Sequence, residues 1–385
     1  GGQSPVRMLT AGGVIHSSPR RLHQACLAAC LLMLCGGLLA EGPLFDDDAV
    51  LEVSIPVDFK SLCRPREDPS CDFTQTTLEY SDEQGPGGRI PVGIKIRGGW
   101  RSLARNCSAP LLWIRFEEQD VEGTPFAGQS LLPLTTHCGR GLSLDYSSSR
   151  LNRSTWEQYL LREYLGHRLF GLLTDMSIRV RLVVIHYLNP ERPGRTVRNY
   201  AFFSEHFDSV AERNGARRLD RGSFDHEKLD TAAADLLALF QYMIGNTDWS
   251  IVRERNTVLM ETSDGLQVPV PYDLDMSGLV NAHYAGPAPG LPIEDVRERY
   301  YLGFCHPDLD WPALFGHFQQ QQHALLSLID AIPQLDRSSR KTSEKFLARF
   351  FTELDSEELR TARIIDACQP WPPPTEDHTT PTEGR

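Results

Sequence analysis

Residues 244–280 have the sequence IGNTDWSIVRERNTVLMETSDGLQVPVPYDLDMSGLV, and this stretch decides the expected fold. A run with the apolar spacing of a helix precedes it and ends at Gly245-Asn246, a common helix stop. Two apolar runs, NTVLME and LQVPVP, flank Ser263-Asp264-Gly265, and Asp-Gly between such runs predicts a β-hairpin. The expected order is helix, polar loop and hairpin, after which the chain emerges at Asp273.

Three carboxylates and one amide are concentrated around this hairpin. Asp248 and Asn256 precede it, and Asp273 and Asp275 follow it. Hard oxygen ligands of this kind suit Mg²⁺ or Mn²⁺, and a carboxylate left off the metal can orient an attacking hydroxyl. The structural alternative is that Asn-Thr-Asp is an ordinary turn and that Asp273 caps a helix.

The order of these elements is typical of the active site in a protein-kinase C-lobe. The segments IGNTDWS, RERNTVL and PYDLDMSGLV resemble the atypical kinases of the spore-coat protein H (CotH) group and, more distantly, HipA-type kinases. The resemblance covers residues 90–320 and is sharpest over 240–285. It implies an α+β, bilobal, protein-kinase-like fold, with a β-rich N-lobe, a helical C-lobe, and ATP with Mg²⁺ or Mn²⁺ as cofactors.

The resemblance also implies a role for each residue around the hairpin. Asp248 would be the catalytic base, Asn256 a metal ligand and Asp273 the principal metal-binding carboxylate, which Asp275 would assist or replace. Asp248 and Asn256 are eight positions apart. The corresponding kinase residues are five apart, so Asn256 reaches the metal only if the intervening WSIVRER bulges.

Kinase-like sites also pair a lysine on an N-lobe strand with a helix glutamate, to hold nucleotide phosphates. Glu163 is the candidate glutamate, with an exposed helix position as the alternative. The segment SLLPLTTHC (130–138) lacks the lysine expected before its His-Cys pair. Lys95 or Arg97 would then substitute, unless both face solvent opposite the apolar face of their strand. Arg97, Arg101 and Arg105, beside Gly98-Gly99, form a second candidate phosphate site.

The amino terminus is typical of an exported protein. Arg20 and Arg21 precede an apolar run at 25–40, which predicts a signal peptide over residues 1–40. A membrane anchor is the alternative, but sixteen apolar residues are short against the ~20 that a span needs. Lipid attachment at Cys30 is a further alternative. We expect a periplasmic or extracellular protein with no membrane span after cleavage.

Six cysteines follow residue 40, an even number that favours disulfides in an exported chain. They allow fifteen connectivities. Cys107 follows the arginine cluster and Cys138 ends the next strand-like segment, so we predict that they pair. Cys63 and Cys71, eight positions apart across a proline-rich loop, form the second predicted bridge. The spacing does not fit zinc.

Apolar periodicity divides the mature chain into three regions. We expect a β-rich N-lobe with a long helix at 41–205, a mainly helical C-lobe with the catalytic loop and hairpin at 206–368, and a disordered tail at 369–385. Ser154 and Glu157 form a predicted capping box. The expected strands are 51–57, 90–97, 111–116, 179–187 and 200–204, and the expected helices are 156–173, 230–244, 293–302, 311–331 and 340–353.

The function expected from these patterns is that of an exported atypical kinase, which transfers phosphate from Mg-ATP to a hydroxyl of a secreted or envelope protein or other acceptor. The formal charge of −12 argues against nucleic acid as a partner. The alternative is a catalytically degenerate relative that acts as a cell-envelope binding or assembly module. The missing lysine favours the module, and the presence of Asp248, Asn256 and Asp273 favours the enzyme.

Overall fold

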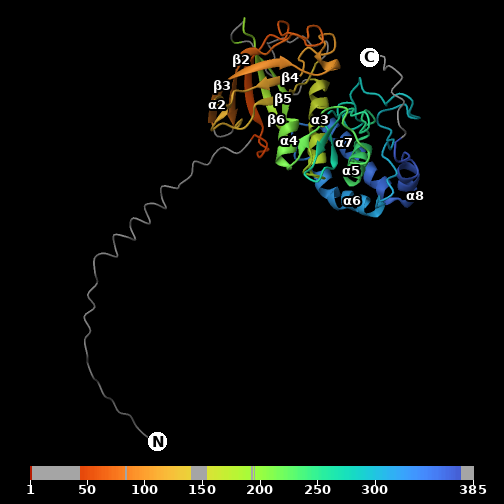
Figure 1. Ribbon diagram of the computed structural model, residues 1–385. Coiled ribbons are helices and arrows are strands. Elements are labelled where there is room, and N and C mark those ends of the chain that lie inside the picture. The colour runs from red at the N-terminus through yellow and green to blue at the C-terminus, as the bar shows by residue number, and fades with distance from the viewer. Residues whose placement is uncertain (2–43, 83–84, 140–153, 192–193, 195, 374–385) are drawn as a thin grey trace, which may run out of the picture. The chain divides into compact units, whose positions relative to one another are not determined.

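Seven strands close into a β-barrel in the order β1-β2-β3-β4-β5-β7-β6 (Figure 1). The computed structural model describes residue 1 and residues 44–82, 85–139, 154–191, 194 and 196–373. The predicted signal peptide lies outside these residues. The barrel strands are β1 (Leu51–Pro56), β2 (Thr74–Asp82), β3 (Gly85–Ile96), β4 (Leu112–Arg115), β5 (Leu131–Thr135), β6 (Val180–Leu188) and β7 (Thr196–Ser204).

The pairing of β1 with β6 closes the barrel. The two strands run parallel, from Leu51 opposite Val183 to Pro56 opposite Leu188, whereas β1 pairs antiparallel with β2. Alternate β1 side chains point into the barrel, and these are the buried residues Leu51, Val53 and Ile55. Burial of this apolar row on one face fixes the register of the strand, because a slip of one residue would expose the whole row.

The prediction of a bilobal, protein-kinase-like fold is wrong. The strands form a closed seven-stranded barrel, and the described residues contain only seven α-helices, an architecture that does not match the expected pair of lobes. The alternating pattern at 51–57 correctly indicated a strand. Its partner β6 lies about 130 positions away in the sequence, and local periodicity carries no information on pairing at that range.

Helix α3 (Thr155–Gly171) packs against β6 and β7 and shares a buried apolar core with the later helices (Figure 1). The hairpin of β9 (Thr257–Glu261) and β10 (Gln267–Pro271) joins β8 (Arg217–Arg218) in a small second sheet. The remaining elements are η1 (Trp100–Ser102), α2 (Glu118–Val121), α4 (Phe207–Arg213), α5 (Thr231–Ile244), α6 (Trp311–Ser327), α7 (Arg337–Asp355), α8 (Glu357–Arg360) and η2 (Thr361–Ile365).

Most local predictions are confirmed. The Ser154 side chain accepts the Glu157 backbone N–H at the start of α3, and the hairpin pairs in register around Asp264-Gly265. The helix expected at 293–302 is wrong. Arg299 explains why: it donates to the Met243 carbonyl and stacks on the Phe346 ring at 4.1 Å, so this irregular segment is fixed by its own side chains.

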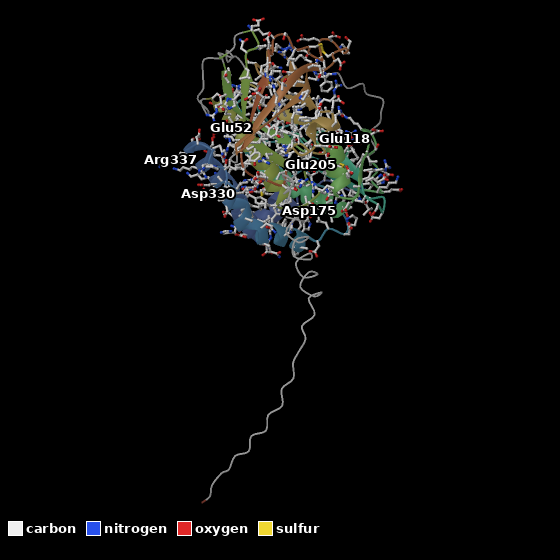
Figure 2. The ribbon with its side chains drawn as sticks, turned by 90° about the vertical axis from the view of Figure 1, so that its left-hand side faces the viewer. Glu52, Glu118, Asp175, Glu205, Asp330 and Arg337 are labelled. Carbon is white, nitrogen blue, oxygen red and sulfur yellow. A yellow bond between two sulfur atoms is a disulfide. The ribbon has the colours of Figure 1, made fainter. Side chains whose placement is uncertain are left out.

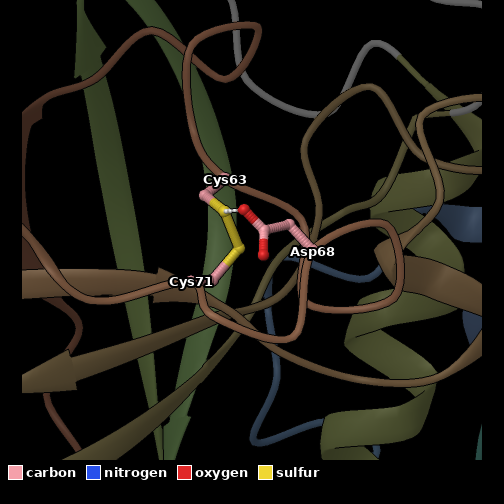
Figure 3. A group of neighbouring side chains, drawn as sticks. All are labelled: Cys63, Asp68 and Cys71. Atoms are coloured by element: carbon pink, nitrogen blue, oxygen red, sulfur yellow. Dashed lines mark hydrogen bonds between the residues drawn. A yellow bond between two sulfur atoms is a disulfide. The ribbon is translucent and has the colours of Figure 1, made fainter.

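Three disulfides fasten the loops. Cys107–Cys138 and Cys63–Cys71 are confirmed, and Cys305–Cys368 is the third. Figure 3 shows Asp68 beside the Cys63–Cys71 bridge, with the Cys63 Sγ 3.9 Å from the Asp68 Oδ2. Cysteines joined in a disulfide offer no thiolate to a metal ion. This group is therefore a covalent clamp on the loop and not a metal centre.

The end of the described chain packs on the helical part. Gln369 hydrogen bonds with the backbone of Gly303 and Cys305, and the Trp371 ring lies 4.3 Å from the His306 ring. Residues 374–385 of the expected tail lie outside the described residues. No helix in the described part of the chain has the length and apolar content needed to cross a membrane.

His137 makes the stability of the barrel depend on pH. It is buried, its Nδ1 has no hydrogen-bond partner among the described residues, and burial lowers its pKa to about 4. In the unfolded chain it takes a proton near pH 6.5. Stability that is present above pH 6.5 should therefore be lost as the pH falls toward 4, by about 3 kcal/mol at most.

The measurement is the free energy of unfolding between pH 7 and 4. His137→Gln should make the profile shallower without flattening it, because burial lowers the pKa of His167 to about 4 as well, while His323→Gln, which changes an exposed histidine, should leave the profile as in the wild type. Equal slopes in wild type and His137→Gln would contradict the prediction.

Candidate functional site

A cavity of about 790 Å³ lies where one end of the barrel meets α3 and the segment after β10. Asp248, Asn256, Asp273 and Asp275 all line it, so the carboxylates and the amide predicted around the hairpin do converge. Glu163 and His167, one turn apart on α3, also line the cavity. The predicted site residues thus share one cavity, with Lys95 and Arg105 as the exceptions.

Arg101 lies at the centre of the acidic residues. Its guanidinium contacts Glu163 at 3.2 Å, Asp273 at 2.7 Å and Asp275 at 3.5 Å. The Arg101 side chain is only 11% exposed, and Tyr284 donates its hydroxyl to Asp275 at 3.1 Å. We expected Glu163 to pair with a cation on a strand, either Lys95 or Arg97. Its partner is instead Arg101, which lies in η1.

Burial and mutual repulsion raise the proton affinity of the acids. Burial, opposed by Arg101, raises the pKa of Asp275 well above its ordinary value, and the neighbouring Asp273 and Glu163 add to that shift. Burial likewise raises the pKa of Glu163, against the pull of Arg101. The three acids in turn hold the pKa of Arg101 well above its ordinary value, despite its burial. One guanidinium thus compensates three carboxylates only in part.

Asp248 and Asn256 are brought together by a bulged loop. Ser250 and Arg255 exchange backbone hydrogen bonds, which closes the WSIVRER segment on itself. The Asn256 Nδ2 then donates to the Asp248 carbonyl at 2.7 Å and to the Asp248 Oδ2 at 3.0 Å. The bulge required by the eight-residue spacing is therefore present, and in it Asn256 orients Asp248.

Two glycines allow the chain to approach closely at this point. Gly245 ends α5 in the left-handed conformation, with φ of 63°, and a Cβ there would lie 2.9 Å from Phe346. Gly166 lets the middle of α3 pack on Leu274, which a Cβ would approach to 3.0 Å. Because Leu274 lies between Asp273 and Asp275, this contact sets the distance of both carboxylates from the helix.

Arg97 and Lys95 differ in whether they line the cavity. Arg97 lines the cavity and donates to the Thr135 hydroxyl at 2.9 Å, but no described carboxylate forms a direct ion pair with it, and its Nε has no described hydrogen-bond partner. Burial and the nearby Arg101 lower its pKa to about 10. Lys95 instead donates to the Cys71 carbonyl, outside the cavity lining. Arg97 is thus a cation that faces the cavity without a counter-ion in contact.

One wall of the cavity is apolar. Pro133, in the segment where a lysine was expected, lines this wall, while its neighbour Leu132 points into the barrel core. The position therefore contributes shape and not charge. The other apolar residues of the wall are Leu111, Trp113, Ile178, Phe202 and Phe207.

His167 and Tyr284 are two of the cavity residues that the sequence analysis did not identify. The sequence could have indicated only His167, because it lies four positions after the candidate Glu163 and residues four apart on a helix share a face. Burial lowers the pKa of His167 to about 4, so it is neutral at pH 7. Tyr284 comes from an irregular segment, where no periodicity exists to place it.

No protein-family model matches the chain, and no curated protein sequence matches it at a significant level.

Replacement of Arg101 should destabilise the fold. Arg101→Met leaves the buried Glu163 and Asp275 without their cation, and removal of one partner from a buried ion pair costs about 3–5 kcal/mol. Arg89→Met is the matched control, because the Arg89–Glu79 pair is exposed and such pairs contribute about 0–1 kcal/mol. Chemical denaturation at pH 7 measures both. A loss for Arg101→Met no larger than that for Arg89→Met would contradict the central role of Arg101.

Proposed function

We propose that the cavity binds a nucleoside triphosphate, with ATP as the expected one, together with Mg²⁺ or Mn²⁺, and transfers a phosphoryl group to a hydroxyl of an exported protein or other acceptor. The carrying observation is that one cavity combines an apolar wall, a cavity-facing Arg97 without a contacting counter-ion, and a cluster of carboxylates with Asp248. The chemistry needs these side chains and not a bilobal fold. The resemblance of 244–280 to CotH-type kinases supports the same assignment.

The residues present fit a divalent cation. Asp273 lies close enough to Asp275 to add to the rise that burial causes in the Asp275 pKa, and one Asp273 oxygen pairs with Arg101. Carboxylate and amide oxygens are the ligands that Mg²⁺ and Mn²⁺ prefer. Asp273, Asp275 and the side-chain amide oxygen of Asn256, Oδ1, would hold the ion. When bound, it would neutralise charge on the phosphates.

The chain's own residues supply binding and orientation. Trp113 and its apolar neighbours would hold the base, and Arg97 would neutralise phosphate oxygens, because a buried guanidinium gains from an anionic partner. Asp248, held by Asn256, would accept a hydrogen bond from the acceptor hydroxyl. The hydroxyl oxygen forms a bond to the terminal phosphorus, the bond from that phosphorus to the bridging oxygen breaks, the diphosphate leaves, and the hydroxyl proton passes to Asp248.

Three disulfides support an oxidising compartment, which favours a secreted or envelope acceptor over a cytosolic one. They do not distinguish among acceptors. The hydroxyl side chains of serine, threonine and tyrosine in exported proteins are the chemical class that we propose, because a carboxylate such as Asp248 can accept a hydrogen bond from a hydroxyl.

A second function is favoured by Arg101 itself. Its guanidinium already occupies the space among Glu163, Asp273 and Asp275, so the acidic cluster is partly neutralised without a metal ion. In this version the protein is an envelope binding or assembly module that retains the cavity but performs no turnover. Nucleotide binding without phosphate transfer would favour the module.

Arg97 should control nucleotide affinity. Arg97→Ala is expected to weaken ATP binding at least tenfold, because the cavity then loses a buried cation that no carboxylate contacts, although Arg221 still lines it. Lys95→Ala is the matched control, since it removes an equal charge two positions away on the same strand but outside the cavity. Calorimetric titration with ATP and Mg²⁺ measures both variants. Equal losses in the two variants would refute the assigned phosphate contact.

Asp273 and Asp248 should give different phenotypes. Asp273→Asn is expected to abolish metal-dependent nucleotide binding together with turnover. Asp248→Asn should spare nucleotide binding and lower phosphate transfer by about 10²-fold or more, the scale typical of a catalytic base. The assays are thermal stabilisation by ATP with Mg²⁺ or Mn²⁺ and phosphate transfer to generic hydroxyl acceptors. Wild-type protein that binds neither nucleotide nor metal ion would overturn the proposed function.

A further inference from the structure

We propose that a second pocket, at the amino-terminal ends of α3 and α7, binds a small hydroxylated ligand that carries one oxyanion group, of the sugar phosphate or sugar sulfate class. The pocket measures about 490 Å³ and is separate from the cavity described above. Arg162, Gln158 and Tyr159 of α3 line it, together with Asp336, Ser338, Ser339 and Thr342 at the start of α7. Asn281 completes the lining from a loop.

Arg162 supplies the observation that points to an anion. Only 6% of this residue is exposed, and it lines the pocket. Its Nε donates to the Gln158 carbonyl and its guanidinium lies over the Tyr159 ring at 5.4 Å, while no hydrogen bond from its two terminal amino groups is found in the described part of the chain. No described carboxylate forms an ion pair with it, and burial lowers its pKa to about 10. A buried guanidinium in this state is stabilised by an oxyanion that accepts from its free fork.

Two helix ends add to this charge. α3 begins at Thr155 after its Ser154 cap, and α7 begins at Arg337 after its Asp336 cap, so the positive ends of both helix dipoles meet at the pocket. Gln158 joins the two ends, because its side chain accepts from the Asp336 N–H at 3.0 Å and donates to the Gln334 carbonyl at 3.3 Å. The pocket walls are therefore preorganised.

The rest of the lining favours hydroxyl groups over a bare anion. It contains no aliphatic side chain, which excludes an apolar ligand. The Asp336 carboxylate would accept hydrogen bonds from sugar hydroxyls, a contact that inorganic phosphate and sulfate cannot replace. Asn281 is held at a φ of 49°, the kind of backbone strain that collects at binding sites. The uncharged polar residues of the lining are Ser154, Thr155, Gln158, Tyr159, Asn281, Ser338, Ser339 and Thr342.

The test titrates the full chain calorimetrically with glucose 6-phosphate, glucose 6-sulfate, glucose, inorganic phosphate and inorganic sulfate. We expect the two sugar esters to bind more tightly than glucose or either inorganic anion. Arg162→Met should weaken sugar-ester binding at least tenfold. Arg337→Ala is the matched control, because this exposed arginine lies beside the pocket at the surface but outside its lining (Figure 2). Arg97→Ala should also leave binding unchanged, which excludes the first cavity.

A second variant keeps the proposal testable if Arg162→Met does not fold. Ser338→Ala with Thr342→Ala changes two partly or fully exposed hydroxyls and should weaken sugar-ester binding without any effect on inorganic phosphate. Wild-type protein that binds no probe, or sugar-ester binding that survives in a folded Arg162→Met, would overturn the site. Glucose bound as tightly as its esters would overturn the oxyanion assignment, and inorganic phosphate bound as tightly would overturn the sugar assignment.

Discussion

The ion pairs of Arg101 hold together parts of the chain that no strand pairing connects. The guanidinium comes from η1, immediately after the barrel strand β3, and it reaches Glu163 of α3 and the two aspartates after β10. Barrel, central helix and hairpin thus meet at one buried cation. Such a network resists removal of any member, because each loss leaves an uncompensated charge in a medium that solvates charge poorly. The shape of the cavity depends on this cluster.

The same interaction sets the balance between the two proposed functions. Arg101 is one cation in contact with three carboxylates, so the acidic cluster is compensated only in part. Arg97 contributes positive charge on the side of the apolar wall, without a carboxylate in contact. The cavity is therefore polarised, with cationic and acidic sides. A metal-bound polyphosphate has the complementary distribution, whereas a ligand of uniform charge would be opposed on one side.

Local features of this chain could be predicted from the sequence, and non-local ones could not. The Ser154 cap, the hairpin around Asp264-Gly265 and two of the disulfides depend on residues whose spacing is visible in the chain. The closure of β1 onto β6 depends on a pairing between distant segments, and it overturned the expected fold. The site showed the same division. The contact between Asp248 and Asn256 forms within one loop, so their spacing in the sequence could indicate it. The pairing of Glu163 with Arg101 instead of Lys95 depends on where the chain runs after β3, which local patterns do not show.

The Cys107–Cys138 bridge has a consequence for how this cavity matures. It anchors the segment that carries Arg101 to the end of β5, and both cysteines are almost completely buried. A thiol reductant in solution cannot reach such a bond without prior local unfolding. Once formed, the bridge therefore keeps the arginine segment docked. In the reduced chain this anchor would be absent, and the acidic residues would repel one another wherever Arg101 was displaced from them.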